Sequence, residues 1–383
     1  MSTQPPSPDP SALAPFGPRR SDTRPSGTRP SGGGSPAGGP SAATASAARA
    51  PRVGIVGATG AVGGELLLCL EQRRFPLSCL RLFASPRSAG RSLLFRQEPV
   101  KVEALTEAAL AELDIVLFSA GSATSRQFAP VAVRHGAVVV DNSSAFRMEP
   151  DVPLVVPEVN AADIGTHRGV IANPNCVAIV ASVPLWPLHR VNPIRRVIAA
   201  TYQAASGAGA AAMEELREST EAYLEGRDYP ARVLAHPYAF NLFSHDTQVD
   251  PATGYNDEET KVIREMRKIM GEPELRIGVT CIRVPVLRAH SIALTVEFAD
   301  PITPDAVRAR LATAPGVRLV DDVAHNHFPM PREASGQDEI LVGRIRQDVS
   351  DPSGRSIALF VAGDQLLKGA ALNAVQIAEK LVV

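Results

Sequence analysis

A cysteine at residue 176 stands where a nucleophile could act. Cys176 follows Asn173, Pro174 and Asn175, at the point where a turn runs into a predicted helix over 177–188. The positive end of a helix dipole favours a thiolate, so this position predicts a lowered thiol pKa and nucleophilic character. From the local pattern alone, a nucleophile and a small structural residue are equally good interpretations.

The other three cysteines, Cys69, Cys79 and Cys281, stand among apolar residues, and we predict that they are replaceable core residues. Four cysteines are too few for a disulfide scaffold in a chain of 383 residues, and no C-x-x-C pair has metal-ligand spacing. We therefore expect no metal site and a reducing, cytoplasmic compartment.

A second candidate constellation runs from Arg283 to His290, at a break between two predicted strands. Histidine titrates near neutral pH, so it can accept a thiol proton and later act as acid or base. An odd spacing along an extended chain places two side chains on opposite faces. Arg283 and His290 can therefore share a site only if Pro285 and the following turn intervene.

A glycine-rich turn predicts a dinucleotide site. Gly57, Gly60 and Gly63 lie between a β-branched run and an apolar stretch with helical spacing. This G-x-x-G-x-x-G spacing lets the backbone approach a pyrophosphate and directs a helix N-terminus toward it. The strand–turn–helix context is the one that the motif requires.

The segment after the next predicted strand, 80–84, favours NADP(H) over NAD(H). An NAD site usually places Asp or Glu at this point to bind the ribose hydroxyl. Here the strand is followed by Ser85, Pro86, Arg87 and Ser88, which offer hydroxyls and a guanidinium. A guanidinium suits a 2′-phosphate, although an ordinary surface charge is the alternative interpretation of Arg87.

The elements that must position these residues fall into two groups. Before Pro174, short β-type runs alternate with helix-compatible segments such as 103–113, which is typical of an α/β, doubly wound parallel sheet. Beyond it, long strands mix with helices over 211–224 and 257–270, which predicts an α+β domain with a broad sheet. We expect a dinucleotide-binding domain over 51–174, completed by a C-terminal helix over 357–383, and a catalytic and dimerisation domain over 175–356.

Residues 1–50 differ from the rest of the chain, because thirty-five of these fifty positions are Pro, Ser, Ala or Gly. Such a segment buries too little apolar surface to form a core, so we predict a disordered extension rather than an organelle transit peptide or a secretory signal. The remaining residues carry a net charge near −4, which argues against a nucleic-acid binder. No apolar run is long enough to predict a membrane span.

Taken together, four motifs resemble those of the aspartate-β-semialdehyde dehydrogenase family. They are the loop 57–64, the turn 173–176, the segment 201–209 and the segment 283–290, and the similarity extends from about Val53 to Val383 in the expected order. One departure is Val177, because the family commonly has Ser or Thr directly after the nucleophile.

The resemblance implies a Rossmann-type first domain and a role for individual residues. It makes Cys176 the nucleophile, His290 the acid/base, Gln203 the residue that orients the thioester, and Asn175 a group that steadies the oxyanion. For the substrate it implies Arg283 at the α-carboxylate, Glu258 at the ammonium, and Lys261 and Arg147 at the phosphate. From the glycine loop, the turn after residue 84 and the resemblance together, the predicted cofactor contacts are Gly57, Thr59, Gly60, Ala61, Val62, Gly63, Ser85, Arg87, Ser88, Ser119, Gly121, Ser206, Gly207 and Asn373.

The reaction that the resemblance implies is the NADPH-dependent reductive dephosphorylation of L-aspartyl-4-phosphate to aspartate-4-semialdehyde, through a cysteine thioester. The product feeds lysine, threonine, methionine and diaminopimelate synthesis. The family habit also implies a homodimer, and the sequence does not decide between a dimer and a tetramer.

Two alternatives remain at this point. An N-acetyl-γ-glutamyl-phosphate reductase shares the chemistry, but it is expected to have glycine and an aromatic residue around its cysteine and has no use for Glu258. A catalytically silent homologue that acts as an interaction protein would be expected to have lost Cys176, His290 or Gln203, and all three are present.

Overall fold

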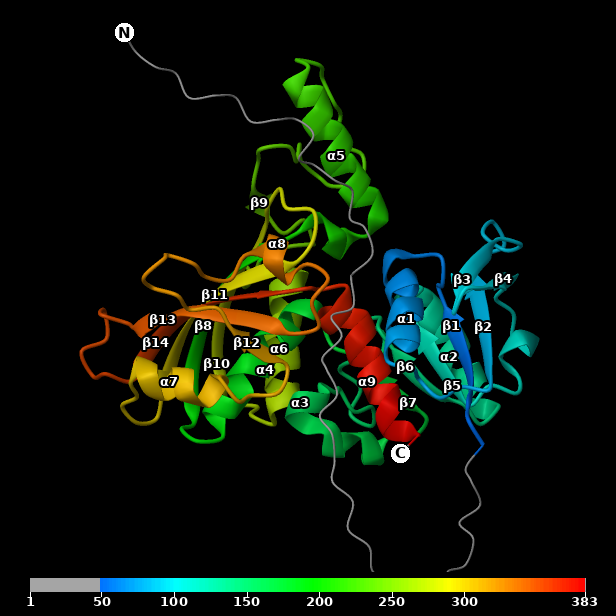
Figure 1. Cartoon of the computed structure of the whole chain (residues 1–383), viewed down its shortest axis with the longest axis horizontal. Helices are drawn as coiled ribbons and strands as arrows, with labels where there is room; N and C mark the ends of the chain where they lie inside the picture. Colours follow the sequence, from blue (N-terminus) through cyan, green and yellow to red (C-terminus); the bar gives the residue numbers. More distant parts are fainter. Residues whose placement is uncertain (1–48, 383) are drawn as a thin grey trace, which may run out of the picture. The chain divides into compact units, whose positions relative to one another are not determined.

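The computed structural model describes residues 49–382, which form two seven-stranded sheets (Figure 1). The first sheet has the order β3-β4-β2-β1-β5-β6-β7, and only the β3–β4 pair is antiparallel. The predicted doubly wound parallel sheet is confirmed. Its strands are β1 (Arg52–Val56), β2 (Cys79–Ala84), β3 (Ser92–Phe95), β4 (Glu98–Ala104), β5 (Ile115–Phe118), β6 (Val138–Asp141) and β7 (Val170–Ala172).

Helices cover both faces of the first sheet, because residues that alternate along each strand enter two different apolar clusters. Ile55 and Leu117 pack with α1 and α9 on one face, whereas Val56 and Phe118 pack with α2 on the other. The helices of this half are α1 (Ala61–Gln72), α2 (Ser122–Arg134), α3 (Pro157–Asn160) and α9 (Leu372–Leu381), with the short 3-10 helices η2 (Ala108–Leu110) and η3 (Ala161–Thr166) and the π-helix η5 (Leu367–Ala371) directly before α9.

The second sheet is mixed, with the order β12-β13-β14-β11-β8-β10-β9. Its strands are β8 (Ile194–Gln203), β9 (Phe243–Ser244), β10 (Arg276–Arg283), β11 (His290–Phe298), β12 (Val317–Leu319), β13 (Ile340–Gln347) and β14 (Ser356–Gly363). The helices of this half are α4 (Cys176–His189), α5 (Ala210–Leu224), α6 (Asp257–Met270), α7 (Pro304–Leu311) and α8 (Pro331–Ala334), with the single turn η4 (Ala205–Ala208).

One face of the second sheet is covered by α4, α6 and α7, which share a single apolar core with its strands. On the opposite face, Ala334 of α8 packs on Leu341 and Ala362, whereas the part along β8 is open to solvent. Along β8, Ile198 is 47% exposed and Tyr202 is 39% exposed. Within residues 49–382, this face of the sheet is therefore uncovered around β8.

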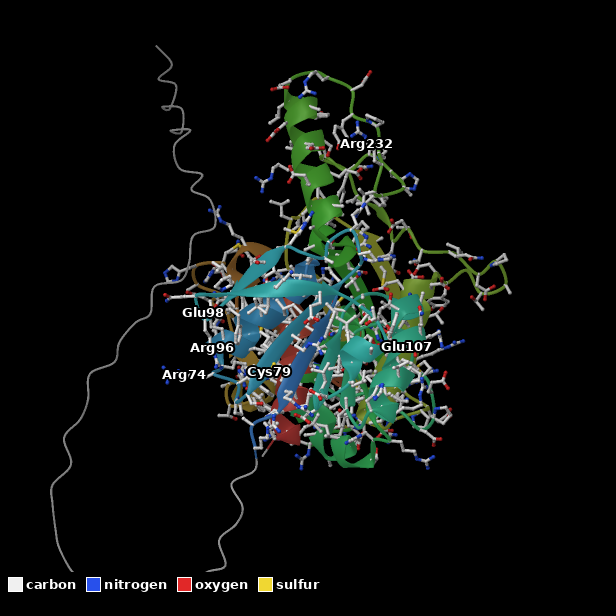
Figure 2. All side chains as sticks on the ribbon, turned by 90° about the vertical axis from the view of Figure 1, so that its right-hand side faces the viewer. Arg74, Cys79, Arg96, Glu98, Glu107 and Arg232 are labelled. Atoms are coloured by element: carbon white, nitrogen blue, oxygen red, sulfur yellow. The ribbon has the colours of Figure 1, made fainter. Side chains whose placement is uncertain are left out.

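Three sequence predictions need correction. The helix-compatible segment 103–113 begins as the end of β4 and contains only the short turn η2, because β3 and β4 form a hairpin that adds the edge of the sheet. Residues 357–363 belong to β14 in the second sheet, so the chain returns to the first half only with η5 and α9. Cys79 is exposed at the start of β2 (Figure 2), whereas Cys69 and Cys281 are buried as predicted.

The predicted disordered extension falls almost wholly on residues 1–48, which lie outside the described range. Within residues 49–382, every helix is too short or too polar to cross a membrane.

Candidate active site

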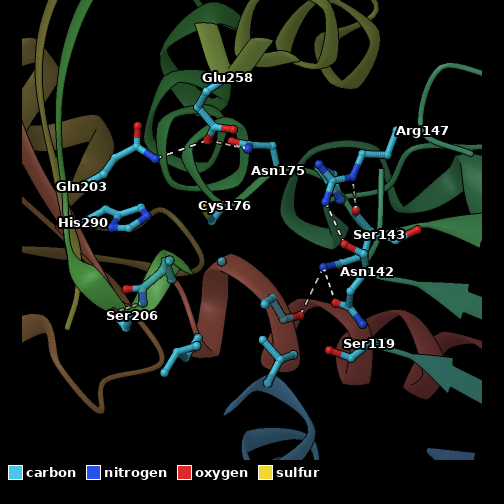
Figure 3. Close-up of a pocket in the computed structure, with 18 of the residues that line it drawn as sticks. Ser119, Asn142, Ser143, Arg147, Asn175, Cys176, Gln203, Ser206, Glu258 and His290 are labelled. Atoms are coloured by element: carbon cyan, nitrogen blue, oxygen red, sulfur yellow. Dashed lines mark hydrogen bonds between the residues drawn. The ribbon is translucent and has the colours of Figure 1, made fainter. Parts of the chain in front are cut away.

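A cavity of about 330 Å³ lies between the two halves of the chain, and residues from both line it (Figure 3). The topology explains this convergence. β8 and β10 run parallel and β11 runs antiparallel to β8, so Gln203, Arg283 and His290 all emerge at one sheet edge. The predicted site residues that line the cavity are Val62, Ser119, Gly121, Arg147, Asn175, Cys176, Gln203, Ser206, Gly207, Glu258, Arg283 and His290.

Cys176 is the first residue of α4, half-buried at the cavity wall, and Asn175 caps the helix. The Asn175 side-chain oxygen accepts hydrogen bonds from the backbone N–H groups of Val177 at 2.8 Å and Ala178 at 3.3 Å. Its amide nitrogen donates to Glu258 Oε1 at 2.8 Å. The Asn175 side chain therefore holds the turn that carries the nucleophile. The helix is capped by Asn175 although Val177, which is buried, has no hydroxyl group.

The expectation of a lowered thiol pKa at Cys176 is wrong for the ligand-free chain. The protein packed around the thiol, together with the carboxylate of Glu258, raises the pKa of Cys176 to about 12, although Arg147 and Arg283 oppose this. A helix N-terminus contributes about 1 kcal/mol, which is less than one pKa unit, so desolvation outweighs it. The resting nucleophile is therefore a thiol.

Glu258 lies in the first turn of α6, which starts with a capping box between Asn256 and Glu259. Its Oε1 accepts hydrogen bonds from Asn175 Nδ2 and, at 3.2 Å, from Gln203 Nε2. Although burial opposes it, His245 and the Asn175 hydrogen bond hold the pKa of Glu258 below its usual range. Glu258 is thus a buried carboxylate that is ready to receive a cation.

Arg283 and His290 do share the cavity, in spite of their odd spacing. β10 ends at Arg283, and Ala289 adopts a left-handed conformation (φ 73°) directly before β11 begins at His290. A Cβ at Gly207 would lie 3.0 Å from the His290 ring and 3.2 Å from Arg283 Nη1. The chain therefore needs glycine at 207 to keep both groups beside the cavity.

The hydrogen bonding of His290 determines which ring nitrogen carries its proton. The backbone N–H of Ala204 donates to His290 Nδ1 at 3.0 Å, so the neutral ring carries its proton on Nε2. Among the described residues, this buried Nε2 has no hydrogen-bond partner, and Figure 3 shows the ring directed into the cavity. Burial and the nearby Arg283 hold the pKa of His290 well below its usual range. The resting ring is a hydrogen-bond donor, which does not fit the predicted role of accepting the thiol proton.

Asp246 orients Arg283 and is absent from the residues that the sequence predicts. Arg283 Nε donates to Asp246 Oδ1 at 3.3 Å, whereas the buried Nη1 has no hydrogen-bond partner within residues 49–382. His245, next to Asp246, also lines the cavity. Both residues lie in an irregular loop, where hydrophobic periodicity gives no signal.

Arg147 is held by a second acidic residue that the sequence does not single out. Its guanidinium donates to Glu265 Oε1 at 3.1 Å and to the backbone carbonyls of Asn142 and Asn173. Glu265 Oε2 also accepts the Asn175 backbone N–H at 2.6 Å. The available signal was helical spacing, because Glu258, Lys261, Glu265 and Lys268 form one polar stripe along α6.

The two lysines of this stripe, Lys268 and Lys261, have different surroundings. Lys268 Nζ donates to three backbone carbonyls of the loop that carries Arg147, those of Arg147, Glu149 and Val152, each at 2.8 Å. Lys261 is half-buried and lies outside the cavity lining.

The glycine loop has the geometry of a cradle. Gly57 has a φ of 87°, and a Cβ there would lie 2.3 Å from the Ser119 carbonyl oxygen. A Cβ at Gly63 would lie 2.3 Å from the Gly57 carbonyl oxygen, whereas Gly60 has room for one. Thr59 and Gly60 are exposed just before α1, which has no side-chain cap. Free backbone donors at a bare helix N-terminus fit a pyrophosphate.

The remaining predicted cofactor contacts differ in position. Ser85, Arg87 and Ser88 form a turn at the end of β2, closed by a hydrogen bond from the Ser88 N–H to the Ser85 carbonyl, and Arg87 is exposed. Asn373 is fully buried and does not line the cavity. Its side-chain amide donates to the Asn173 side chain at 2.6 Å, so it holds in place a residue that lines the cavity.

Comparisons with known proteins agree with this geometry. The family model described as "Semialdehyde dehydrogenase, NAD binding domain" matches residues 52–167. The model described as "Semialdehyde dehydrogenase, dimerisation domain" matches residues 185–368. Aspartate-semialdehyde dehydrogenase from Synechocystis sp. is 54% identical over 331 residues, covering 86% of this chain and 97% of that protein. The chain belongs to the aspartate-semialdehyde dehydrogenase family. The family's enzyme from Aquifex aeolicus is 47% identical over 336 residues, covering 86% of this chain and 98% of its own.

A solved family structure has the same fold. The crystal structure of aspartate semialdehyde dehydrogenase II from Vibrio cholerae, complexed with ASA, has a TM-score of 0.84 and 41% identity, covering 88% of this chain and 99% of that one. Membership of this family makes the chain an oxidoreductase with a nicotinamide cofactor, and the dimerisation domain indicates an oligomer.

Proposed function

We propose that this chain reduces L-aspartyl-4-phosphate to L-aspartate-4-semialdehyde with NADPH, through a thioester on Cys176. The observation that carries this proposal is the convergence of Cys176, His290, Arg283 and Glu258 on one cavity. Glu258 also favours an amino-acid substrate over the N-acetylated substrate of the alternative reductase, because an acetylated nitrogen carries no charge to balance a buried carboxylate.

The charges around the cavity match the substrate. The unpartnered Nη1 of Arg283 suits the α-carboxylate, and Glu258 suits the ammonium group. Arg147 lies on the opposite side of Cys176 from Gln203 in Figure 3, where it suits the phosphate. Lys261 adds positive potential on the α6 side, and Gln203 is placed to orient the acyl group.

Substrate binding itself activates the nucleophile. The ammonium group neutralises Glu258, which is one of the causes of the raised thiol pKa. Cys176 Sγ then bonds to the acyl carbon, the bond from that carbon to the phosphate oxygen breaks, and the thiol proton leaves with the phosphate. Arg147 receives the departing dianion, and a thioester remains.

Reduction then needs an oxyanion donor. When bound at the glycine loop, NADPH supplies the hydride that converts the thioester to the aldehyde oxidation level. His290 Nε2–H donates a hydrogen bond to the oxyanion, which collapses to the aldehyde and the Cys176 thiolate. The thiolate recovers its proton from solvent, which completes the cycle.

The purified chain tests this function in the reverse direction. We expect NADPH formation that requires aspartate semialdehyde, phosphate and NADP⁺ together. Activity with N-acetylglutamate semialdehyde and none with aspartate semialdehyde would overturn the proposed substrate.

We propose that Arg87 confers the preference for NADPH. The exposed turn 85–88 presents its guanidinium and two hydroxyls where the adenosine ribose would lie. Arg87→Ala is expected to raise the KM for NADPH about tenfold and that for NADH less than about twofold, because only NADPH carries the 2′-phosphate. Arg346→Ala, which removes an exposed arginine from β13, is the matched control. Equal effects on both cofactors would remove Arg87 from the phosphate site.

We also propose a homodimer formed through the open face of the second sheet. Ile198 and Tyr202 expose apolar surface there, and the Tyr202 ring lies 6.0 Å from that of Phe360. Tyr202→Glu is expected to shift a sedimenting dimer to a monomer, since it buries a charge in a symmetric contact. Leu94→Glu, on the exposed β3, is expected to leave the dimer intact. An unchanged dimer in Tyr202→Glu would place the interface elsewhere.

A further inference from the structure

An ion-paired arginine joins the cofactor half of the cavity to the catalytic half, outside the residues discussed so far. Arg288 lies between β10 and β11, two residues before His290. Its Nη1 lies 2.6 Å from Glu65 Oε1, and its Nε donates to Asp364 Oδ2 at 2.7 Å. All three side chains are largely buried, with 22% of Arg288, 13% of Glu65 and none of Asp364 exposed. Both pairs are thus shielded from solvent.

Each carboxylate in this triad lies on a segment that lines the cavity with other residues. Glu65 lies on α1, three residues after Val62, so it shares a helix face with a residue that lines the cavity. Asp364 follows β14, and its other oxygen accepts the backbone N–H groups of Leu366 and Leu367. Leu366 lines the cavity as well. Arg288 therefore contacts the helix that follows the glycine loop and the segment that closes the cavity.

The backbone around Arg288 transmits its position to His290. The Ala289 N–H donates to Gln365 Oε1 at 2.9 Å, and Ser335 Oγ donates to the Arg288 carbonyl at 3.3 Å. Ala289 has a φ of 73°, a conformation that a non-glycine residue keeps only when its surroundings impose it. A shift of Arg288 would therefore move the start of β11 and the His290 ring.

We propose that Arg288 is a positioning residue that locks the cofactor helix α1 to the His290 loop, and so sets the approach of the nicotinamide to the Cys176 thioester. The inference rests on the proposed function. It predicts that loss of the Glu65–Arg288 pair weakens cofactor binding and slows hydride transfer, while the phosphate step, which uses Arg147 on the far side, stays intact.

The test separates these steps in the reverse direction. Enzyme mixed with NADP⁺ and aspartate semialdehyde, without phosphate, is expected to give one burst of NADPH as the thiohemiacetal loses a hydride to NADP⁺ and a proton to solvent, leaving the thioester. In Glu65→Gln and Arg288→Met we expect the burst rate to fall about tenfold and the Kd for NADP⁺, from fluorescence titration, to rise at least about threefold. The KM for phosphate is expected to stay within about twofold. The double variant is expected to be no slower than Arg288→Met, because both changes remove one interaction.

Arg73→Met is the matched control, because Arg73 lies near the end of α1 and pairs with Glu379 of α9 at 2.7 Å. We expect its burst rate and Kd to match the wild type. A burst within about twofold of wild type in Glu65→Gln and Arg288→Met would overturn the inference, and so would equal slowing by Arg73→Met. Absence of a burst in the wild type would instead overturn the proposed function.

Discussion

Cys176→Ala is expected to lower the rate of NADPH formation from aspartate semialdehyde by at least about 10⁴-fold, because no other group can form the covalent intermediate. Within residues 49–382, Cys176 is the only cysteine that lines the cavity. Wild-type enzyme incubated with semialdehyde and NADP⁺ without phosphate should carry one aspartyl group on the peptide that contains Cys176, detected by mass spectrometry. Cys79→Ser, which changes an exposed cysteine, is the control and should keep full activity. Wild-type activity in Cys176→Ala would disprove the nucleophile assignment.

The pH dependence of Cys176 alkylation tests its resting state. A thiol whose pKa is raised to about 12 is protonated throughout the neutral range. The rate of reaction with iodoacetamide should therefore rise about tenfold per pH unit, without a plateau below about pH 10, in the absence of substrate. Saturating aspartate, whose ammonium can neutralise Glu258, should accelerate alkylation. A plateau near neutral pH without ligand would show that the helix dipole does outweigh burial.

His290→Ala is expected to lower kcat by about 10²- to 10³-fold, the usual effect of removing an oxyanion donor. His290→Gln keeps a side-chain N–H donor and should recover about tenfold of this loss, whereas it could not replace a base. The KM for phosphate should change little in either variant. His325→Ala, which alters a largely exposed histidine, is the control.

The pH profile separates donor from base at His290. Its pKa is lowered, so the ring remains neutral as the pH falls through 6.5, and the Nε2–H donor persists. We therefore expect no ionisation near pH 6.5 in the burst rate of wild-type enzyme. A burst that declines below about pH 6.5 in the wild type and loses this decline in His290→Gln would show that His290 acts as a base.

Much of the candidate site could be predicted from local sequence. Gly57 and Gly63 predicted a tight strand–turn–helix connection. In the structure, a side chain at either position would collide with a backbone carbonyl. The helix after Asn175 and the polar start of α6 follow from caps and periodicity, which act within one turn. Several short motifs that occur in the order expected for the family indicated the family. Each motif specifies a local backbone geometry that the family's chemistry requires.

Long-range contacts leave no local pattern in the sequence. Hydrophobic periodicity did not reveal β3 or β4, because a short edge hairpin has little apolar face to display. Glu265 and Asp246 act on arginines far away in the chain, so no local pattern links the partners. Cys79 looked like a core residue because its neighbours are apolar, but its position at the strand start leaves it exposed.

The sequence by itself determined which groups this protein has for chemistry: a cysteine at a helix start, a histidine and arginines near a strand break, and a glycine loop for a dinucleotide. Only the tertiary structure decided their chemical state. Burial beside Glu258 makes Cys176 a thiol, and the Ala204 N–H makes His290 a donor at Nε2. Likewise, Arg288 became a link between the two halves only when α1 met the loop before β11. The physical reason is that identity and spacing are encoded locally, whereas desolvation, proton location and ion pairing depend on neighbours that the fold brings from elsewhere in the chain.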